Sequence, residues 1–526
     1  MEDHIYEESS FPFALEKLSR IDRNNQVYAW THQSTNSGAK RDDHHIDPLN
    51  GVGVHPNSLG RYVEQLSHPK KLDEMRERVR DHKVHIQFDG TFLIHHLFVV
   101  IASHYEEGEV VNTCLGLVDC DGRETYEGIN SCISEVLDRA NIDPSNVVGI
   151  SCDRAAANIK YLREIASASY EGAVHLPCLC HTVDSVLGKA NTPNFMEIAQ
   201  PFCRYYKFSS KFRGHVNEFF QCSKNVPGLV ATRWAYSIPF AEWLWEVRGT
   251  FREFIANCKL HPSFKNSQLV DTIHRKVNDR ERDWGDALME TRFVMGLKEI
   301  AGIIKKVEGD GIRAISAFEA LETIHSFDDV VTKVKKACRS DPCSSNLRDD
   351  VWEKLRDYLD SEIVLEESKM SNAINILDLL RVFNPYWLST GGDLDVGVIH
   401  QLSTHIPLLT PLVSDLLDEV EEFCKSARRF TRNVGNLTES EIDRSILEYF
   451  HKICHDPRFP AFGRAIPIIA ALQCTSAASE RAFSRVKKQF DYSRHQSKLS
   501  KMEFELMTAM NLAPPTTSNK VINYLS

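Results

Sequence analysis

The sequence predicts a protein of the α/β plus α class, in which a mixed sheet with helices is joined to a large all-helical part. Two observations lead to this prediction. Between residues 84 and 178, short apolar runs typical of strands alternate with stretches of helical spacing. From about residue 185 to 475, apolar residues recur every three or four positions almost throughout. A chain of 526 residues that is 42% hydrophobic is long enough for about two to four domains.

Three consecutive strands predict an antiparallel meander. In VHIQFD, residues 84–89, apolar and polar side chains alternate as in a half-buried strand. The apolar runs at 93–104 and 110–119 predict the second and third strands, because turn residues at 106–108 separate them. Adjacent strands with such short connections pair most readily in an antiparallel sense.

The chain then alternates helices and strands. Helical spacing predicts helices at 123–142 and 157–166, with a third helix starting at His181. Apolar runs predict strands at 146–153 and 172–178. Because a helix between two strands favours a parallel connection, these strands are expected to extend the sheet in parallel. The complete order, β-β-β-α-β-α-β-α, is the ribonuclease H-like arrangement.

Residues 1–82 are polar and rich in Gly, Pro, Asn and Ser, which predicts a loop or a partly ordered arm. The chain has no apolar run of about 18 residues for a membrane span, and its start lacks a secretory signal. Fourteen cysteines without a regular framework fit a reducing compartment, the cytosol or the nucleus. The net charge of −11 argues against coating of nucleic acid by bulk electrostatics, so DNA contacts would need local basic patches.

Two aspartates end apolar strands that can lie side by side. Asp89 ends the first strand and Asp153 the fourth, so both carboxylates can meet at one edge of the sheet. Such a pair is repulsive unless a divalent cation neutralises it, and Mg²⁺ prefers oxygen ligands. A third carboxylate, Glu480, lies on the polar side of a helix predicted at 476–490. Alternatively, the aspartates are turn or cap residues and Glu480 only complements the helix dipole.

Several motifs resemble those of hAT-superfamily transposases and occur in the same order. Residues 475–512, which begin TSAASERAFS, are similar to the family's C-terminal dimerisation region, where a small-residue run precedes Ser-Glu-Arg. The stretch GISCDRAAAN resembles the motif of the family's second aspartate, with Asn158 following Asp153. Cys178 and His181 match a Cys-x-x-His motif.

The resemblance implies a ribonuclease H-like catalytic domain that is interrupted by a long helical insertion. Residues 83–200 would form the first part of this domain, and 201–474 the insertion. Residues 475–526 would complete the domain and form the dimerisation region, with 1–82 as an N-terminal arm.

The resemblance also implies the chemistry of the site. Asp89, Asp153 and Glu480 would be catalytic acids that bind Mg²⁺ or Mn²⁺ for two-metal cleavage and transfer of DNA strands. His181 would lie beside them and contact the scissile phosphate or a metal-bound water. Alternatively, it is a helix-start histidine satisfied by the backbone.

Two stretches before the C-terminal region suit DNA contacts. Arg233 and Trp234 resemble the family's Arg-Trp motif, whose tryptophan is implicated in holding a DNA end with one base displaced; a core tryptophan is the alternative. In residues 202–224, basic and aromatic residues are interleaved, which suits a nucleic-acid track as well as an amphipathic helix. The basic residues in question are Arg204, Lys207, Lys211 and Arg213.

The C-terminal region is itself basic. Residues 481–501 hold seven basic residues and one acid. Phosphate contacts by Arg481, Lys487 and Lys488 are the prediction, and a solvated surface is the alternative. In residues 502–512, methionine, phenylalanine and leucine recur near helical spacing, which suits a dimerisation surface or ordinary core packing.

Two features depart from the family pattern. A zinc finger of the BED type usually precedes the catalytic domain, but the first cysteine is Cys114; a second ligand pair to complement Cys178 and His181 is also missing, so no structural zinc is expected. Thr91 stands where the family commonly has a tryptophan.

We therefore expect a nuclear, homodimeric or higher-oligomeric hAT transposase-like protein that binds DNA and has no membrane partner. It would act either as a metal-dependent transposase or as a domesticated or truncated, non-catalytic dimerisation and DNA-binding factor.

Overall fold

The structure is a computed structural model that describes residues 68–511 with internal gaps. The gaps are 93–95, 121–124, 190–191, 222–225, 230–234, 236, 280, 310, most of 327–370, 393, 395, 431–438 and 490–498. The described elements belong to one compact unit, His68–Ser526. Among these elements, no helix is both long enough and apolar enough to span a lipid bilayer.

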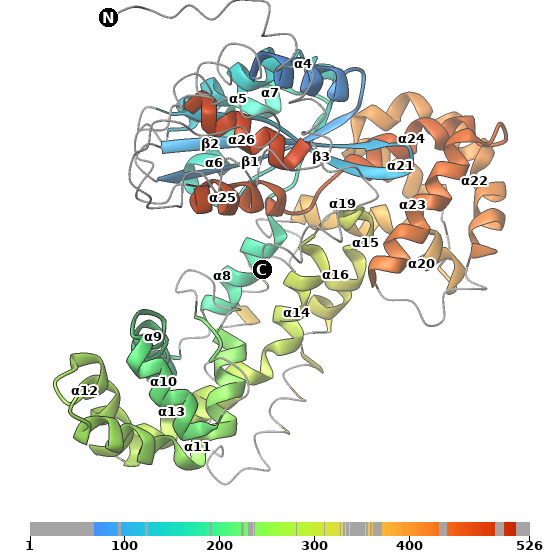
Figure 1. The fold of residues 1–526 in the computed structure, drawn as a ribbon. Coiled ribbons are helices and arrows are strands. Elements are labelled where there is room, and N and C mark those ends of the chain that lie inside the picture. Colours follow the sequence, from blue (N-terminus) through green and yellow to red (C-terminus); the bar gives the residue numbers. More distant parts are fainter. Residues whose placement is uncertain are drawn as a thin grey trace, which may run out of the picture. The chain divides into compact units, whose positions relative to one another are not determined.

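One five-stranded mixed sheet forms the centre of the α/β part (Figure 1). Its strands are β1 Val84–Phe92, β2 His96–Glu106, β3 Glu109–Asp119, β4 Val147–Ser151 and β5 Val174–His175. Their order in space is β3-β2-β1-β4-β5. The first three strands pair in an antiparallel sense, and β4 and β5 add in parallel to β1. The predicted meander and its parallel extension are confirmed.

Helices follow and separate the parallel strands, as their apolar spacing predicts. These elements are α5 Tyr126–Ala140, η3 Pro144–Asn146, α6 Ala156–Tyr161, the π-helical turn η4 Leu162–Ala166, α7 Ser167–Ser169 and α8 Leu179–Gly188. Helix α5 begins after Thr125, whose hydroxyl accepts a hydrogen bond from Gly128 N, and ends at Asn141 in the left-handed conformation. Local caps and an apolar stripe therefore fix this helix.

The helix α4, His68–Val79, lies within the stretch for which the composition predicts an arm. The structure differs from that prediction because Met75 and Val79, one helical turn apart, are buried in the core beside the sheet. A few apolar residues at the right spacing suffice to dock a helix in an otherwise polar segment. Residues 1–67 lie outside the described part of the chain.

Between α8 and the C-terminal helices, no strand occurs among the described residues, as the spacing predicts. The elements are α9 Pro193–Phe208, α10 Ser210–Phe220, α11 Ser237–Leu260, α12 Gln268–His274, η6 Arg275–Asp279, α13 Glu281–Gly296, α14 Lys298–Val307, α15 Arg313–Ser316, α16 Phe318–His325, α19 Ser371–Leu380, η9 Arg381–Phe383, α20 Pro385–Ser389, α21 Val396–His405, η10 Pro407–Leu412, α22 Val413–Ala427, α23 Glu439–His455 and α24 Pro460–Ala471. Aromatic side chains hold the first of these helices together. The ring of Phe202, for example, lies 5.4 Å from Phe212 and 5.2 Å from Trp243, centroid to centroid.

Two C-terminal helices pack on the sheet although they are distant from it in sequence (Figure 1). Helix α25, Ala477–Gln489, contacts β1 and β2, and α26, Leu499–Asn511, contacts β3. The predicted apolar side of α25, including Phe483, is buried there. Met502 and Met507 of α26 are buried in the same core, so these two methionines serve packing within the chain.

Helix α26 also covers the edge strand β3. The Asn511 side-chain amide pairs with the backbone of Cys114, accepting from its N at 2.8 Å and donating to its O at 3.1 Å. Glu503 Oε1 accepts a hydrogen bond from Leu117 N at 2.8 Å. A Cβ on Gly116 would lie 2.8 Å from the same carboxylate oxygen, so this close approach requires glycine. Polar groups of the edge strand are thereby satisfied within the chain.

Most described cysteines behave as small core residues. Of the nine free cysteines among the described residues, seven are buried, in keeping with the sequence interpretation. Cys120, which follows β3, and Cys132 of α5 are joined by a disulfide that the sequence did not predict.

Candidate functional site

Strand pairing brings the two predicted aspartates together. Strands β1 and β4 are parallel, with Gln87 opposite Ser151. Two residues further along each chain, the same register brings Asp89 opposite Asp153. The prediction that Asp89 ends its strand is wrong, because β1 continues to Phe92 and still pairs with β2 there. Asp153 was predicted as the last residue of its strand, but β4 ends at Ser151, so Asp153 lies two residues beyond it.

The carboxyl group of Asp89 lies in an unfavourable electrostatic environment. Burial and the negative charge of Asp153 raise its pKa to about 6 from an ordinary value of 3.8. A hydrogen bond from Gly90 N, 2.8 Å long, and the charge of His181 lower the pKa but do not cancel this effect. Burial and the charge of Asp153 thus disfavour the ionised form of Asp89, and perturbed carboxyl groups of this kind are typical of functional sites.

Asp153 is held by the start of α6. Its Oδ1 accepts hydrogen bonds from Asn158 Nδ2 at 2.5 Å and from Ala155 N at 3.0 Å. Asn158 is buried. The Asp-to-Asn spacing in the sequence motif thus becomes a direct contact that fixes the carboxylate, a role that the sequence interpretation did not assign to Asn158.

The third acid, Glu480, meets a histidine that also acts on Asp89. Glu480, in the first turn of α25, places Oε1 3.5 Å from Nδ1 of His181 in α8. The Sγ of Cys178, a ring nitrogen of His181 and a carboxylate oxygen of Glu480 all lie within 4.8 Å of one another. The hydroxyl of Ser476 donates to Glu480 Oε1 at 3.5 Å. Ser476 was not predicted, and only its place in the small-residue run before Ser-Glu-Arg signals it.

Backbone contacts fix the start of α8. Cys178 N donates to Cys152 O, directly after β4, and Leu179 N donates to Cys474 O, shortly before α25; both bonds are 2.9 Å long. Burial opposes ionisation of the Cys178 thiol, but hydrogen bonds with Cys180 and His181 hold its pKa well below the ordinary value. These contacts join the sheet, α8 and α25 at one place.

The donor set of this site suits divalent cations. Asp89, Asp153 and Glu480 offer the hard carboxylate oxygens that Mg²⁺ and Mn²⁺ prefer. The charge of Asp153 contributes to the raised pKa of Asp89, which is the sign expected where a cation is needed. These ligand types match the predicted metal. Among the described residues, however, the ligand atoms at this site that lie within 4.8 Å of one another belong to Cys178, His181 and Glu480, and not to the three acids.

The predicted DNA-binding residues are placed only in part. Arg233 and Trp234 lie outside the described residues, and the side chains of Lys487 and Lys488 on α25 do as well. Arg481 is half-buried, one residue after Glu480. Nearby, Arg485 Nη1 donates to Ala509 O of α26 at 2.6 Å, so this basic residue serves to pack two helices.

On α9 and α10, the basic residues are exposed and most of the aromatic residues are at least partly buried. Among the aromatic residues, Tyr206 and Phe212 are buried, which favours the amphipathic-helix interpretation, whereas Phe208 is 75% exposed. The basic residues of this stretch are all exposed. They are Arg204, Lys207, Lys211 and Arg213. Packing thus accounts for most of the aromatic pattern and leaves a basic surface beside one exposed ring.

A comparison with protein families identifies the C-terminal part. Residues 419–511 match the hAT family C-terminal dimerisation region. A comparison with curated proteins gave no match. The family match confirms the predicted resemblance in this part of the chain: residues 419–511 are similar to the hAT dimerisation region, which supports a hAT transposase-like protein and association with a second copy.

The matched region includes both the end of the helical part and the helices on the sheet. Its first residue, Glu419 of α22, accepts hydrogen bonds from Ala461 N at 2.8 Å and Phe462 N at 3.1 Å, at the start of α24. Glu480 lies within the same region. The family match and the candidate site therefore share one helix, α25.

Proposed function

We propose that this chain binds DNA and cleaves and transfers DNA strands in a metal-dependent reaction of the hAT transposase type, as a homodimer or a larger homo-oligomer. One observation carries the proposal: Asp89 interacts with Asp153 and His181, and His181 lies 3.5 Å from Glu480. Four separate elements contribute these residues. A carboxyl group whose pKa is raised by burial and by a second carboxylate is typical of a functional site, and a bound cation would relieve the repulsion.

The proposed fold around this site is a ribonuclease H-like domain. The order β3-β2-β1-β4-β5, antiparallel in its first three strands and parallel in the last two, supports this assignment. In this fold, residues 201–474 would be an insertion, after which α25 returns to the sheet with Glu480.

Asp89, Asp153 and Glu480 would hold Mg²⁺ or Mn²⁺. When bound, such ions polarise a phosphate and generate a nucleophilic hydroxide at neutral pH. The remaining work falls to the chain's own side chains. Asn158 orients the carboxylate of Asp153, and His181 can donate a hydrogen bond to a phosphate oxygen through the ring nitrogen that does not face Glu480.

DNA contacts are proposed for the basic surface of α9 and α10 and for the residues predicted from the sequence. Phe208, exposed beside Lys207, offers a ring on which an unpaired base can stack. The sequence-based candidates remain Arg233, Trp234, Arg481, Lys487 and Lys488. The protein would act in the nucleus, where its DNA substrate lies.

A non-catalytic DNA-binding and dimerisation factor is the second candidate function. The observation that favours it is Thr91, which stands two residues after Asp89 in β1, where the family commonly has a tryptophan. Such a factor would keep the fold and dimerisation without strand cleavage.

The decisive experiment incubates the purified chain with Mg²⁺ or Mn²⁺ and labelled DNA ends from the flanks of its own gene. We expect nicking and joining that Asp153→Asn lowers by about 100-fold or more. Glu135→Gln, which changes an exposed acid of α5, is the matched control and should leave activity unchanged. Products that do not depend on Asp153 would refute catalysis at this site, and DNA binding without products would favour the non-catalytic factor.

A further inference from the structure

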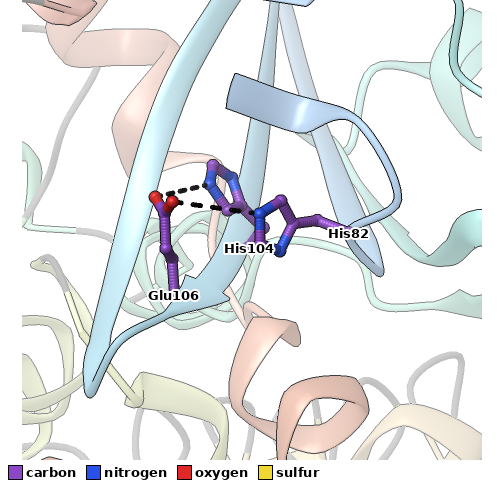
Figure 2. A group of neighbouring side chains, drawn as sticks. All are labelled: His82, His104 and Glu106. Carbon is purple, nitrogen blue, oxygen red and sulfur yellow. Dashed lines mark ion pairs between the residues drawn. The ribbon is translucent and has the colours of Figure 1, made fainter. Parts of the chain in front are cut away.

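A second group of metal-ligating side chains lies at the other end of β1 and β2. His104 Nε2 is 3.6 Å from Glu106 Oε2, and His82 Nε2 is 4.0 Å from Glu106 Oε1. Ligand atoms of all three residues lie within 4.8 Å of one another. Figure 2 shows the carboxylate of Glu106 facing both imidazole rings. We refer to these three residues as the His-His-Glu cluster.

The fold of the sheet places these residues on one face. His104 and Glu106 are two positions apart on β2, so their side chains point the same way. The antiparallel register pairs Val84 with His104, and its continuation brings His82 opposite Glu106. The cluster is therefore a consequence of strand register.

Two turns with positive φ values define the chain on either side of the cluster. Asp81, at φ 61°, ends the turn after α4 and delivers His82 to the start of β1. Glu107 and Gly108, at φ 47° and 86°, form the two-residue hairpin that follows Glu106. The ligands therefore lie next to tight turns with a fixed backbone conformation, and not on a long loop.

His104 is the strained member of the cluster. Its side chain is 0% exposed, and neither ring nitrogen makes a hydrogen bond to the described residues. A buried imidazole in this state costs free energy, because both nitrogens lose their water partners on folding. A cation bound by Nε2 would supply the missing partner.

We propose that the His-His-Glu cluster binds Zn²⁺ through three protein ligands and leaves a fourth position to water. Zinc binds histidine nitrogen and carboxylate oxygen at about 2.0–2.1 Å, which puts tetrahedral ligands about 3.3–3.4 Å apart. The separations of 3.6 and 4.0 Å exceed this by roughly 0.2–0.3 Å and 0.6–0.7 Å, so the side chains would move slightly closer together around the ion. Mg²⁺ is disfavoured because it prefers oxygen ligands.

The surroundings are compatible with a bound cation. His82 and Glu106 are 31% and 41% exposed, so solvent reaches the open side of the cluster. His104 itself is fully buried, and Arg78 is close enough for its positive charge to act on the imidazole. Within the cluster, negative charge for a cation comes from the carboxylate of Glu106.

Zinc at this position would have a structural effect. It would join the connection between α4 and β1 to the hairpin between β2 and β3. The site lies away from the acids, since seven residues of extended chain separate His82 from Asp89, roughly 23 Å. It also departs from the sequence prediction of no structural zinc, because none of its ligands lies in a cysteine motif.

The test measures zinc binding by the full chain in competition with a chromophoric chelator, in the presence of excess Mg²⁺. We expect His82→Ala and Glu106→Gln each to abolish the binding of one zinc equivalent or to lower its affinity by at least about 10-fold. Both positions are half-exposed, so the variants should remain folded, which circular dichroism checks. Cobalt substitution should give tetrahedral absorption bands that both variants lose.

Matched controls separate this site from other histidines and acids. His400→Ala, on an exposed position of α21, and Glu107→Gln, next to Glu106, should leave zinc binding unchanged. His181→Ala reports any zinc held by Cys178, His181 and Glu480, and should not affect the equivalent lost in His82→Ala. Unchanged zinc stoichiometry and affinity in both His82→Ala and Glu106→Gln would overturn the proposal.

Discussion

The two ends of β1 present contrasting groups of side chains. At one end, Asp89 meets Asp153, with Glu480 and His181 close by, and all four residues come from different elements. At the other end, the His-His-Glu cluster arises from a local turn and one strand pairing. The first end is rich in oxygen ligands. At the second end two imidazole rings face one carboxylate, and neither ring nitrogen of His104 has a hydrogen-bond partner among the described residues. The same sheet thus carries the acids proposed to hold Mg²⁺ or Mn²⁺, which depend on distant segments, and the proposed zinc site, which does not.

The largest expected effect concerns the distant segments. Glu503 of α26 is buried, accepts from Leu117 N, and forms ion pairs with Arg139 and His68. Glu503→Ala should lower the free energy of unfolding by about 3–5 kcal/mol, since it leaves buried partners without a counter-charge. Urea denaturation in a chelating buffer measures this loss.

Glu106→Gln at the other end of the sheet is the matched comparison. The ion pairs of Glu106 with His82 and His104 are partly exposed. Without zinc, the variant should therefore lower the free energy of unfolding by less than about 1 kcal/mol. Equal effects of the two variants would contradict the contrast between distant and local assembly.

A second prediction concerns pH dependence at the acid end. The pKa of Asp89 is about 6 in the folded chain and near its ordinary 3.8 when unfolded. The folded state therefore binds this proton more tightly, and stability is lost as pH rises from about 4 to about 6. Because the carboxyl is only partly shielded from solvent, the loss should be on the order of 1–2 kcal/mol.

Asp89→Asn tests this directly. Without divalent cations it should be more stable than wild type at pH 7 and equal to it near pH 4. Added Mn²⁺ should raise the melting temperature of the wild type and not of the variant. Greater stability of the wild type at pH 7 in chelator would contradict a net repulsive environment at Asp89.

The smallest expected effect is on DNA affinity, and it compares the basic surface of α9 and α10 with the His-His-Glu cluster. Lys207→Ala and Lys211→Ala, on the exposed basic surface, should each reduce the slope of log affinity against log salt by about one. Fluorescence anisotropy over a series of salt concentrations measures the slope. His82→Ala should leave it unchanged, and an equal change in all three variants would rule out a specific role for α9 and α10.

Local periodicity and turn chemistry made much of this protein predictable from its sequence. Alternating side chains identify the strands, helical spacing identifies α5 and α25, and the strand order alone suggests that Asp89 and Asp153 are neighbours. The polar side of α25 indicates that Glu480 faces away from the core. These features depend on residues close together in the chain, where sequence and conformation are directly linked.

Other features were decided only by the tertiary structure. Met502 and Met507 are equally suited to a dimer surface and to a core, and only the docking of α26 on β3 makes them core residues. The contact of His181 with Glu480 depends on the return of α25 after the helical part. The His-His-Glu cluster depends on register, because a shift of one residue would turn each strand's side chains to the opposite face. Strand register and long-range packing depend on the free energy of the whole folded chain, and local patterns in the sequence do not determine it.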